Sequence, residues 1–289
     1  AANLQAEVNT LALQAVVLGG AGASLSVVGG ASGNTYYGVS SSGALLSVSY
    51  ASLVPSATLN GNNSSNLPTA LTGTAAGNWY FMGGPGADTI TGNSQANTFI
   101  GGSGADIITS GGGADYIDGG LGTDTFNFAS ADLTSSVTLS GGSQADTIVF
   151  TAAATVADSA FTNVSSVESI TGTVGLNISV GSLAQAAGIT TVTGGTTSDS
   201  FTDALTTGTT PFNFVGGNGA DTFSFANSTR FAADYVTGGT GLDQIVITTD
   251  GQSLADGAFA RIAAGTIESL SLSGGANSIV FGTTANAAG

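Results

Sequence analysis

The sequence predicts an all-β fold, in which a parallel β-solenoid stacks short strands as successive rungs. Residues 83–127 divide into five nonapeptides in one register, GGPGADTIT, GNSQANTFI, GGSGADIIT, SGGGADYID and GGLGTDTFN. Position 8 of every nonapeptide is apolar, which gives each short strand one inward-facing side chain. Glycine supplies 46 of the 289 residues, and Thr, Ser, Ala, Val and Ile dominate the rest, a composition that favours turns and strands.

Position 6 of the nonapeptides is Asp88, Asn97, Asp106, Asp115 and Asp124 in turn. Glycines before it permit a tight turn that directs carbonyls towards an ion, and Ca²⁺ takes about six to eight such oxygen ligands. The pattern GGxGxD-x-apolar-x resembles the calcium-binding repeat of RTX proteins, in which each repeat forms a turn and a short strand of a parallel β-roll. A flexible glycine-rich linker is the alternative, but a linker would not keep an apolar residue at every ninth position.

Successive repeats of such a roll alternate between two sides, so the resemblance implies an ion between repeat i and repeat i+2. Asp88, Asp106 and Asp124 then stack on one side, each behind an intact GGxG turn. Asn97 and Asp115 stack on the other side, behind the altered turns GNSQ and SGGG. We therefore expect the first side to bind Ca²⁺ well and the second side to bind it weakly or not at all.

Residues 1–82 are predicted to form an N-terminal β region with degenerate repeats and a polar loop. A short helix over residues 4–15 is expected near the start, although residues 11–18 suit a strand equally well. Between residues 19 and 50, altered nonapeptides carry Ser24 and Asn34 at the Asp position. We expect strands without calcium there.

Residues 51–72 contain two prolines and the run NGNNSSN, which predict a loop. Residues 73–81, GTAAGNWYF, form another altered repeat with Asn78 at the Asp position. The aromatic run that begins at Trp79 is expected to have a structural role, with contact to a partner as the less favoured alternative.

A longer repeat follows the tight roll of residues 83–127. Asp124 and Asp146 recur 97 residues later as Asp221 and Asp243. The segment VESI, which contains Glu168, has its counterpart 100 residues later in IESL, which contains Glu268. We predict two solenoid modules, over residues 122–218 and 219–289, the second one incomplete.

The Asp positions of these modules lie 22 residues apart, which is two nonapeptides plus four and predicts coils with one widened side. The turns GGSQAD, GGNGAD and GGTGLD resemble the intact motif, whereas GGTTSD before Asp199 is weaker. The ladder expected on one side of the solenoid is Asp88, Asp106, Asp124, Asp146, Asn177, Asp199, Asp221, Asp243 and Asn277. The predicted calcium ligands are Asp88, Asp106, Asp115, Asp124, Asp146, Asp199, Asp221 and Asp243. Glu168 and Glu268 are expected to face solvent by strand alternation, with an arginine or Ca²⁺ as the alternative partner.

Charge and composition exclude several functions. The net charge is −16, and the chain has two arginines and no Lys, His or Cys. It cannot neutralise phosphates, so we expect no nucleic-acid partner, and the lack of an apolar run of about 18–20 residues predicts no membrane insertion. Neither a zinc site built on His nor a nucleophile paired with a His base can form, so we expect no enzyme. Paired carboxylates could in principle support glycoside chemistry, but the aspartates lie in the turns, where we expect Ca²⁺ to occupy them. The absence of Cys fits a secreted bacterial protein that metal stabilises.

The nonapeptides, together with the VESI, IESL and GGANSIV strands, resemble the surface-layer proteins of Gram-negative bacteria, of the Caulobacter type. This resemblance implies export by a type I system, a β-solenoid body, an extracellular or cell-surface location and calcium-driven assembly into a layer or filament.

The ends of the chain suggest how copies assemble. NISVGSLAQAAG in the first module is followed by ITTVTGGTTSDSF, whereas SIVFGTTANAAG in the second reaches Gly289. Residues 14–27 have the form of the rung that would follow, so we expect a head-to-tail homopolymer. The alternative is a calcium-stabilised binding module or adhesin segment of a larger secreted protein, with cell-surface polysaccharide as a further partner. Ice binding is a minor option, because no regular TxT array is present.

Overall fold

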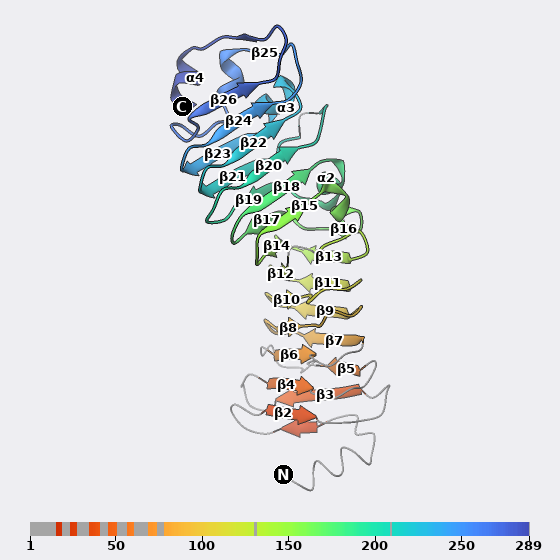
Figure 1. Cartoon of the computed structure of the whole chain (residues 1–289). Helices are drawn as coiled ribbons and strands as arrows, with labels where there is room; N and C mark the ends of the chain where they lie inside the picture. The colour runs from red at the N-terminus through yellow and green to blue at the C-terminus, as the bar shows by residue number, and fades with distance from the viewer. Residues whose placement is uncertain are drawn as a thin grey trace. The chain divides into compact units, whose positions relative to one another are not determined.

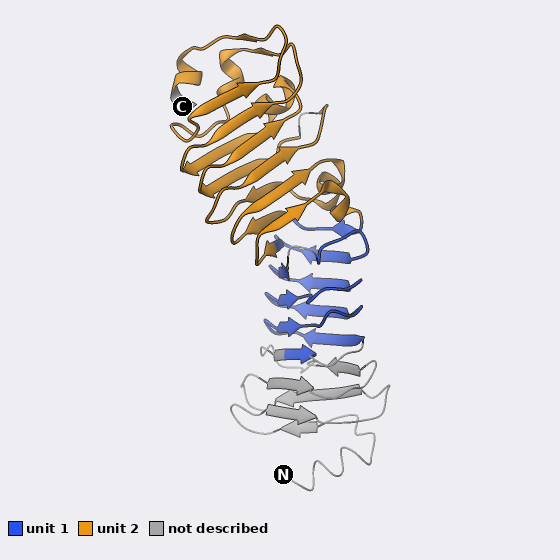
Figure 2. Cartoon of the chain, in the orientation of Figure 1, with its two compact units in different colours: residues 1–128, 132–148, 163–167 blue, residues 129–131, 149–162, 168–289 orange. Residues whose placement is uncertain are grey.

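The structure is a computed structural model that describes residues 78–129, 132–208 and 210–288, together with six strands before them. The chain forms two compact units (Figure 2). Unit 1 comprises residues 1–128, 132–148 and 163–167, and unit 2 comprises residues 129–131, 149–162 and 168–289. The modules of residues 122–218 and 219–289 describe sequence repetition and stay a prediction.

Unit 1 is a parallel β-solenoid in which successive strands alternate between two sheets (Figure 1). One sheet contains β1 (Val16–Leu18), β3 (Thr35–Ser40), β5 (Ala57–Asn60), β7 (Trp79–Gly84), β9 (Thr98–Ser103), β11 (Tyr116–Leu121), β13 (Thr138–Ser143) and β16 (Val164–Ser165). The strands that unit 1 contributes to the other sheet include β2 (Ser24–Val27), β4 (Leu46–Tyr50), β6 (Thr69–Gly73), β8 (Thr89–Thr91), β10 (Ile107–Thr109) and β12 (Thr125–Phe128).

Within the tight roll of residues 83–127, the strand register advances by two nonapeptides per coil. Ile108 pairs with Ile90 on one neighbouring strand and with Phe126 on the other. Phe99 pairs in the same way with Ile117 in the opposite sheet. All five of these position-8 side chains are buried, and they form one thin core between the sheets. The prediction of a parallel solenoid with alternating repeats is therefore confirmed.

The aromatic residues of β7 extend this core. Trp79 is 2% exposed, and its ring centroid lies 6.1 Å from that of Phe81. Phe81 stacks in turn on Phe99 at 5.0 Å. Tyr80, which lies between the first two, points outward and is exposed. The prediction of a structural role for Trp79 is confirmed.

The strands before residue 78 correct part of the sequence analysis. Val16–Leu18 is a strand, and residues 4–15 lie outside the described residues. The expectation of a loop over residues 51–72 was wrong in part, because β5 and β6 lie there. These strands pair in parallel with β7 and β8, so their short alternating segments extend both sheets. The polar run after Asn60 lies outside the described residues.

Unit 2 is also a parallel β-solenoid. One of its sheets contains β15 (Ala154–Val156), β18 (Leu176–Val180), β20 (Ser200–Asp203), β22 (Thr222–Phe225), β24 (Gln244–Ile247) and β26 (Ser269–Leu272). Facing strands are β17 (Ser169–Gly172), β19 (Thr191–Thr193), β21 (Asn213–Asn218) and β23 (Tyr235–Thr240), and β25 (Ser253–Leu254) pairs with β27 (Ser278–Ile279). The boundary between the units divides β14 (Thr147–Phe150).

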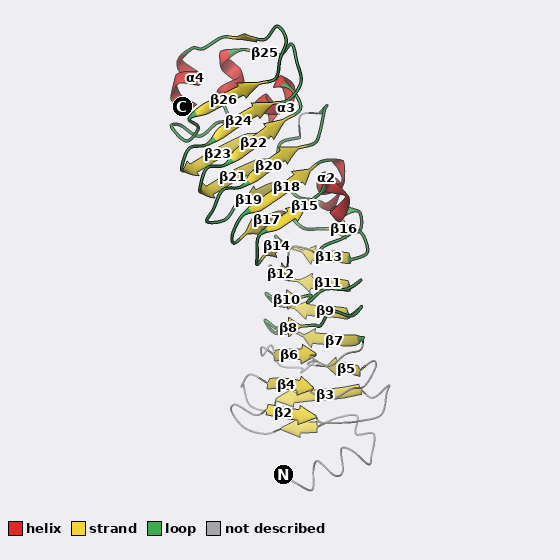
Figure 3. Cartoon of the chain, in the orientation of Figure 1, coloured by secondary structure: helices red, strands yellow, loops and turns green. Residues whose placement is uncertain are grey.

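The coils of unit 2 have one tight side and one widened side, as predicted. Phe223 pairs with Phe201 and with Ile245, which sets a register of 22 residues per coil. The longer connections contain η1 (Asp158–Phe161), α2 (Ser182–Ala187), α3 (Ser228–Ala233), η2 (Asp256–Phe259) and α4 (Thr283–Ala288), drawn in red in Figure 3. No described helix is long and apolar enough to cross a membrane.

These helices were not predicted from the sequence, although two of them have local signals. Gly188 ends α2 in the left-handed conformation, with φ of 103°, which glycine adopts easily. The Asn227 side chain begins α3 by accepting hydrogen bonds from the N–H groups of Thr229 and Arg230. The helices are too short to show an amphipathic period, so only these caps could have revealed them.

Candidate functional site

The aspartates of the tight turns in unit 1 form a ladder of hydrogen bonds from coil to coil. The N–H of Asp88 donates to Asp106 Oδ1 at 2.7 Å, and the N–H of Asp106 donates to Asp124 Oδ1 at 2.8 Å. The N–H of Asp124 donates to Asp146 Oδ1 at 2.7 Å. All four side chains are buried. Each of these bonds joins neighbouring coils through a single carboxylate oxygen.

The second carboxylate oxygen of the ladder faces a small space that only glycine leaves open. Oδ2 of Asp106 and of Asp124 is buried and has no hydrogen-bond partner within the described residues. A Cβ added to Gly101 would lie 2.5 Å from Asp106 Oδ2 and 2.5 Å from the carbonyl oxygen of Gly119. A buried carboxylate oxygen without a partner is costly, and a cation held by this oxygen and nearby carbonyls would remove that cost. The residues present therefore fit Ca²⁺.

Burial in this ladder favours the protonated carboxyl group when no cation is bound. It raises the pKa of Asp106 to about 7; the hydrogen bond from the Asp88 N–H opposes the shift, and the charges of Asp88 and Asp124 add to it. Burial raises the pKa of Asp124 as well. A site that holds these carboxylates ionised must supply positive charge, because the surrounding turns contain none.

The other side of unit 1 satisfies its polar groups without a cation. The N–H of Asn97 donates to Asp115 Oδ1 at 2.7 Å, which continues the same ladder geometry. The Asn97 amide donates to the carbonyl oxygens of Asn93 at 3.0 Å and Gln95 at 2.8 Å, both in its own turn. The Ser110 hydroxyl donates to Asp115 Oδ2. Burial still raises the pKa of Asp115 to about 6. This arrangement agrees with weak or absent calcium binding on this side.

Unit 2 has its own ladder. The N–H of Asp199 donates to Asp221 Oδ1 and that of Asp221 to Asp243 Oδ1, both at 2.8 Å. Oδ2 of Asp221 and of Asp243 is buried without a hydrogen-bond partner in the described part of the chain. A Cβ on Gly216 would collide with Asp221 Oδ2 and with the carbonyl oxygen of Gly238, which repeats the arrangement of unit 1. Burial raises the pKa of Asp221 to about 6.

Asp199 differs from the other ladder aspartates of this unit. Its Oδ1 accepts a hydrogen bond from the Leu176 N–H, and its Oδ2 accepts one from the Gly195 N–H of its own turn at 2.9 Å. Both carboxylate oxygens are therefore occupied by backbone donors. This geometry agrees with the weaker binding expected for the turn GGTTSD.

The expectation of one continuous ladder was wrong in three places. The strands that follow Asp106 and Asp221, β10 and β22, belong to different sheets, so each unit has a separate ladder. Leu176, not Asn177, occupies the rung before Asp199, because Ile178 pairs with Phe201 in the core. The strand register thus follows the inward apolar residues and shifts the count by one.

The C-terminal part of the expected ladder also needs correction. Asn277 accepts a hydrogen bond from the Gln252 N–H at 2.8 Å, on the β25–β27 pair, and does not follow Asp243. Glu268 takes that rung, because the Asp243 N–H donates to Glu268 Oε2 at 2.6 Å. Glu268 is exposed, as expected, but strand alternation alone did not reveal this contact.

A buried ionic cluster on the widened side of unit 2 was not predicted from the sequence. Arg230 is fully buried and donates from Nε to Asp203 Oδ2 at 2.5 Å and from Nη2 to Asp234 Oδ1 at 2.8 Å. Its remaining N–H groups donate to the carbonyl oxygens of Gly208 and Thr210. Arg230 thus binds two carboxylates and two carbonyls, the donor types that surround a calcium ion. A lone arginine in a strand-rich sequence gives no signal of this role.

The donor set of the turns is carboxylates combined with backbone carbonyls. No group of three or more His, Cys, Asp or Glu side chains that could hold a metal occurs within the described residues. Together, the parallel solenoid and its glycine turns define a calcium-binding β-roll protein.

The comparisons with known proteins identify the repeats. The family model of the RTX calcium-binding nonapeptide repeat (four copies) matches residues 80–107 and 91–126. These residues are therefore RTX repeats, and Ca²⁺ is the ion that such repeats bind. No curated protein and no solved structure matches the chain.

The two sides of unit 1 should respond differently to loss of a carboxylate. Asp106→Ala and Asp115→Ala each remove the acceptor of one buried N–H, which costs about 1–3 kcal/mol. Only Asp106→Ala should also remove a bound ion, worth about 2.7 kcal/mol when Ca²⁺ is 100-fold above its Kd. Urea unfolding followed by circular dichroism, with Ca²⁺ and with chelator, would measure both variants. Equal losses in Ca²⁺ would contradict the assignment of calcium to one side.

Proposed function

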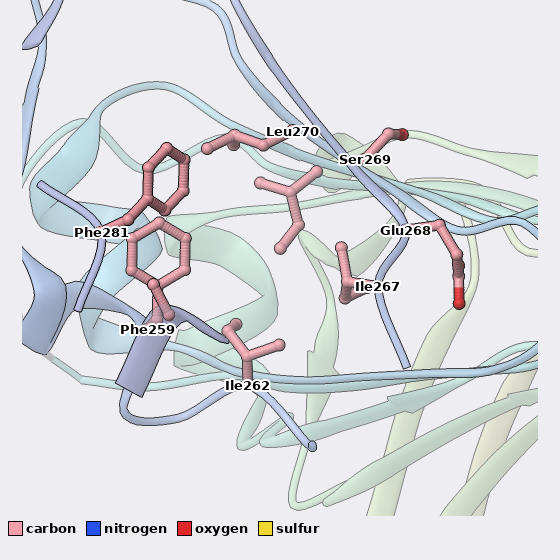
Figure 4. Close-up of a pocket in the computed structure, with 9 residues that line it drawn as sticks. Phe259, Ile262, Ile267, Glu268, Ser269, Leu270 and Phe281 are labelled. Carbon is pink, nitrogen blue, oxygen red and sulfur yellow. The ribbon is translucent and has the colours of Figure 1, made fainter. Parts of the chain in front are cut away.

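We propose that the protein is an extracellular structural protein that assembles through Ca²⁺ into a surface layer or filament, by head-to-tail stacking of solenoid ends. The observation that supports this proposal most strongly is a largely apolar cavity beside β26. It has a volume of about 260 Å³ and is lined by Phe259, Ile262, Ile267, Leu270 and Phe281 among its apolar residues and by Glu268 and Ser269 as polar ones (Figure 4). The ring centroids of Phe259 and Phe281 lie 6.1 Å apart at one edge of the cavity.

An inner coil of unit 2 indicates what covers such a surface. Asp158 accepts the N–H of Gly181 at the start of α2, and Asp256 accepts that of Gly282 at the start of α4, so the two segments correspond. In the inner coil Val180, the residue before Gly181, is fully buried. Phe281 stands at the same position before Gly282 and is 64% exposed.

The covering element of the inner coil is the next rung of the solenoid. Ile170 on β17 pairs with Val192 on β19, and Ile178 on β18 pairs with Phe201 on β20. All four side chains are fully buried. A rung with apolar residues at alternate positions would therefore complete the surface at β26, and an extended parallel strand is the shape that fits it.

Strand edges provide complementary contacts for such a rung. Within the described residues, β1 pairs only with β3, β2 only with β4, and β26 only with β24. Exposed strand edges pair with other chains unless they are covered. An edge strand of one copy can add in parallel to β26 of another, and a heterologous contact of this kind repeats without closing into a dimer.

The second candidate function is a calcium-stabilised binding module or adhesin segment of a larger secreted protein, with cell-surface polysaccharide as its partner. RTX repeats occur in secreted proteins, which supports an extracellular location for either function. RTX rolls are typically structural modules without catalytic activity. The absence of His, Cys and Lys also supports a non-enzymatic role.

Electron microscopy of the purified chain in millimolar Ca²⁺, beside the same sample in chelator, tests the proposal. We expect ordered fibres or sheets in Ca²⁺ that disappear in chelator. Phe281→Asp should prevent them, because it places a charge in the apolar contact. Val174→Asp, at an exposed turn of the same unit, is the matched control and should assemble normally.

Deletion of residues 1–27 should also abolish polymers without unfolding residues 83–289. Folded monomers at saturating Ca²⁺ would contradict assembly and favour the binding module. Polymers that persist in the deletion variant or in Phe281→Asp would show that another surface makes the contact.

A further inference from the structure

Glu268 takes the place of a ladder aspartate in a coil that has no GGxGxD motif. Its Oε2 accepts the Asp243 N–H at 2.6 Å, just as Asp243 Oδ1 accepts the Asp221 N–H at 2.8 Å. The residues before Glu268 read AAGTI, so no sequence motif marks this rung. The side chain is one methylene longer than aspartate, and it reaches the same donor from a different backbone turn.

A threonine carbonyl replaces the glycine carbonyl of the motif at this rung. A Cβ on Gly238 would collide with Asp243 Oδ2 and with the carbonyl oxygen of Thr266. The Thr266 hydroxyl accepts the Gly238 N–H at 3.1 Å and donates to the Ala263 carbonyl at 3.0 Å, which fixes the position of this residue. The space beside Gly238 is therefore bordered by the same kinds of oxygen as in the intact turns.

The same substitution occurs once more in the chain. A Cβ on Gly141 would collide with the carbonyl oxygen of Ser166 and lie 2.5 Å from Asp146 Oδ2. Ser166 stands two residues before Glu168, as Thr266 stands two residues before Glu268. The carbonyl of a hydroxyl residue is thus the regular neighbour of a ladder aspartate where a glutamate coil follows.

Asp243 supplies an oxygen that lacks a partner. The exposed fraction of Asp243 is 0%, and its Oδ2 has no hydrogen-bond partner among the described residues. The described salt bridges involve only Arg230, which Asp203 and Asp234 already occupy. The buried Oδ2 of Asp243, with the Glu268 carboxylate beside it, therefore has no positively charged partner in the described part of the chain.

We propose that Asp243, the Thr266 carbonyl and Glu268 form a calcium site in which the glutamate replaces the aspartate of the repeat. Hard oxygen donors of this kind suit Ca²⁺, which tolerates irregular coordination better than Mg²⁺ does. An ion at this position holds the segment directly before the edge strand β26. The inference rests on calcium binding by the repeats and does not depend on assembly.

Counting the ions bound to the full-length chain by native mass spectrometry, with affinities from calcium titration calorimetry, tests this site. Glu268→Gln keeps an oxygen that accepts the Asp243 N–H but loses the charge, and we expect it to bind one ion fewer than the wild type. Asp250→Asn is the matched control, because Asp250 is an exposed carboxylate of the same unit outside the ladder. It should bind the wild-type number of ions.

Glu268→Asp provides the second variant, because it keeps the charge but shortens the reach. We expect it to lower the affinity for one calcium ion at least tenfold and to leave the affinities for the other ions unchanged. Unchanged ion number and affinity in either Glu268 variant would overturn this site while leaving calcium binding by the motif turns intact. A wild-type chain that binds no calcium would instead contradict the repeats as a whole, and this site with them.

Discussion

Chelation of Ca²⁺ should destabilise the protein strongly at pH 8 and much less at pH 5. In the calcium-free fold, burial raises the pKa of Asp106 to about 7 and those of Asp115 and Asp221 to about 6. The ordinary value in the unfolded chain is 3.8. The folded state therefore binds more protons than the unfolded state between about pH 4 and pH 7. Its stability is highest below this window and is lost as the pH rises through the folded pKa values.

Bound Ca²⁺ reverses this dependence on pH. An ion favours ionised carboxylates, so protons compete with it, and the stabilisation that it provides decreases as the pH falls. Each ion contributes about 2.7 kcal/mol when Ca²⁺ is 100-fold above its Kd, and several ions add. The calcium-bound protein should therefore unfold at a higher temperature at pH 8 than at pH 5.

Thermal unfolding at pH 5 and pH 8, each with Ca²⁺ and with chelator, would measure the direction in which stability changes with pH in the calcium-bound and in the calcium-free protein. We expect Tm in chelator to rise by about 5 °C or more on acidification, since 1 kcal/mol shifts the Tm of a domain of this size by roughly 2–4 °C. The Asp106→Ala variant should show a smaller rise, because it lacks a carboxyl group whose pKa burial raises to about 7. A chelated protein that is more stable at pH 8 than at pH 5 would contradict the buried ladder.

Replacement of Arg230 by methionine should lower the free energy of unfolding by about 3–5 kcal/mol, even in saturating Ca²⁺. The substitution leaves the buried Asp203 and Asp234 without their cation and frees the carbonyls of Gly208 and Thr210. Methionine has a similar length, so the loss reports the charge and its hydrogen bonds more than a cavity. Urea unfolding in Ca²⁺, followed by circular dichroism, would measure it.

Arg261→Met is the matched control for this prediction. Arg261 is half-buried, and its guanidinium lies 4.7 Å from the centre of the Tyr235 ring, a contact worth about 0.5–1 kcal/mol. Asp234→Asn should cost less than Arg230→Met, because the asparagine oxygen can still accept hydrogen bonds from Arg230 and from the Phe212 N–H, and because burial and the neighbouring Asp203 raise the pKa of Asp234 and so make its ionised form less favourable. An Arg230→Met protein as stable as the Arg261→Met protein would show that the cluster does not stabilise unit 2.

The nonapeptides could be interpreted correctly because their signal is local and repeated. Ile90 and Ile108 recur at the same position of alternate repeats, so the pleat and the coil length follow from counting. The widened coils of unit 2 were also predictable, since Asp221 and Asp243 keep a fixed spacing. Counting failed at Asn177, where one extra residue in a turn is invisible in the spacing but shifts Leu176 into the ladder.

The remaining features depend on contacts between coils. The roles of Glu268 and Arg230 arise only when coils more than 20 residues apart in the sequence lie against one another. A single glutamate or arginine has no periodicity, and its partners are chosen by the path of the widened connections. The short helices of unit 2 belong to the same class, because their ends are fixed by caps such as Asp158 from the preceding coil.

The sequence by itself determined the parallel solenoid, the calcium-binding repeats and the aspartates of the tight turns. It could do so because glycine, aspartate and one apolar residue recur at intervals that fix turn, ligand and core within each repeat. The tertiary structure alone decided that each unit has its own ladder, that Glu268 extends one of them and that Arg230 serves as an internal cation. These outcomes depend on the strand register between coils, which is set by the fit of inward side chains such as Ile178 and Phe201 across neighbouring strands.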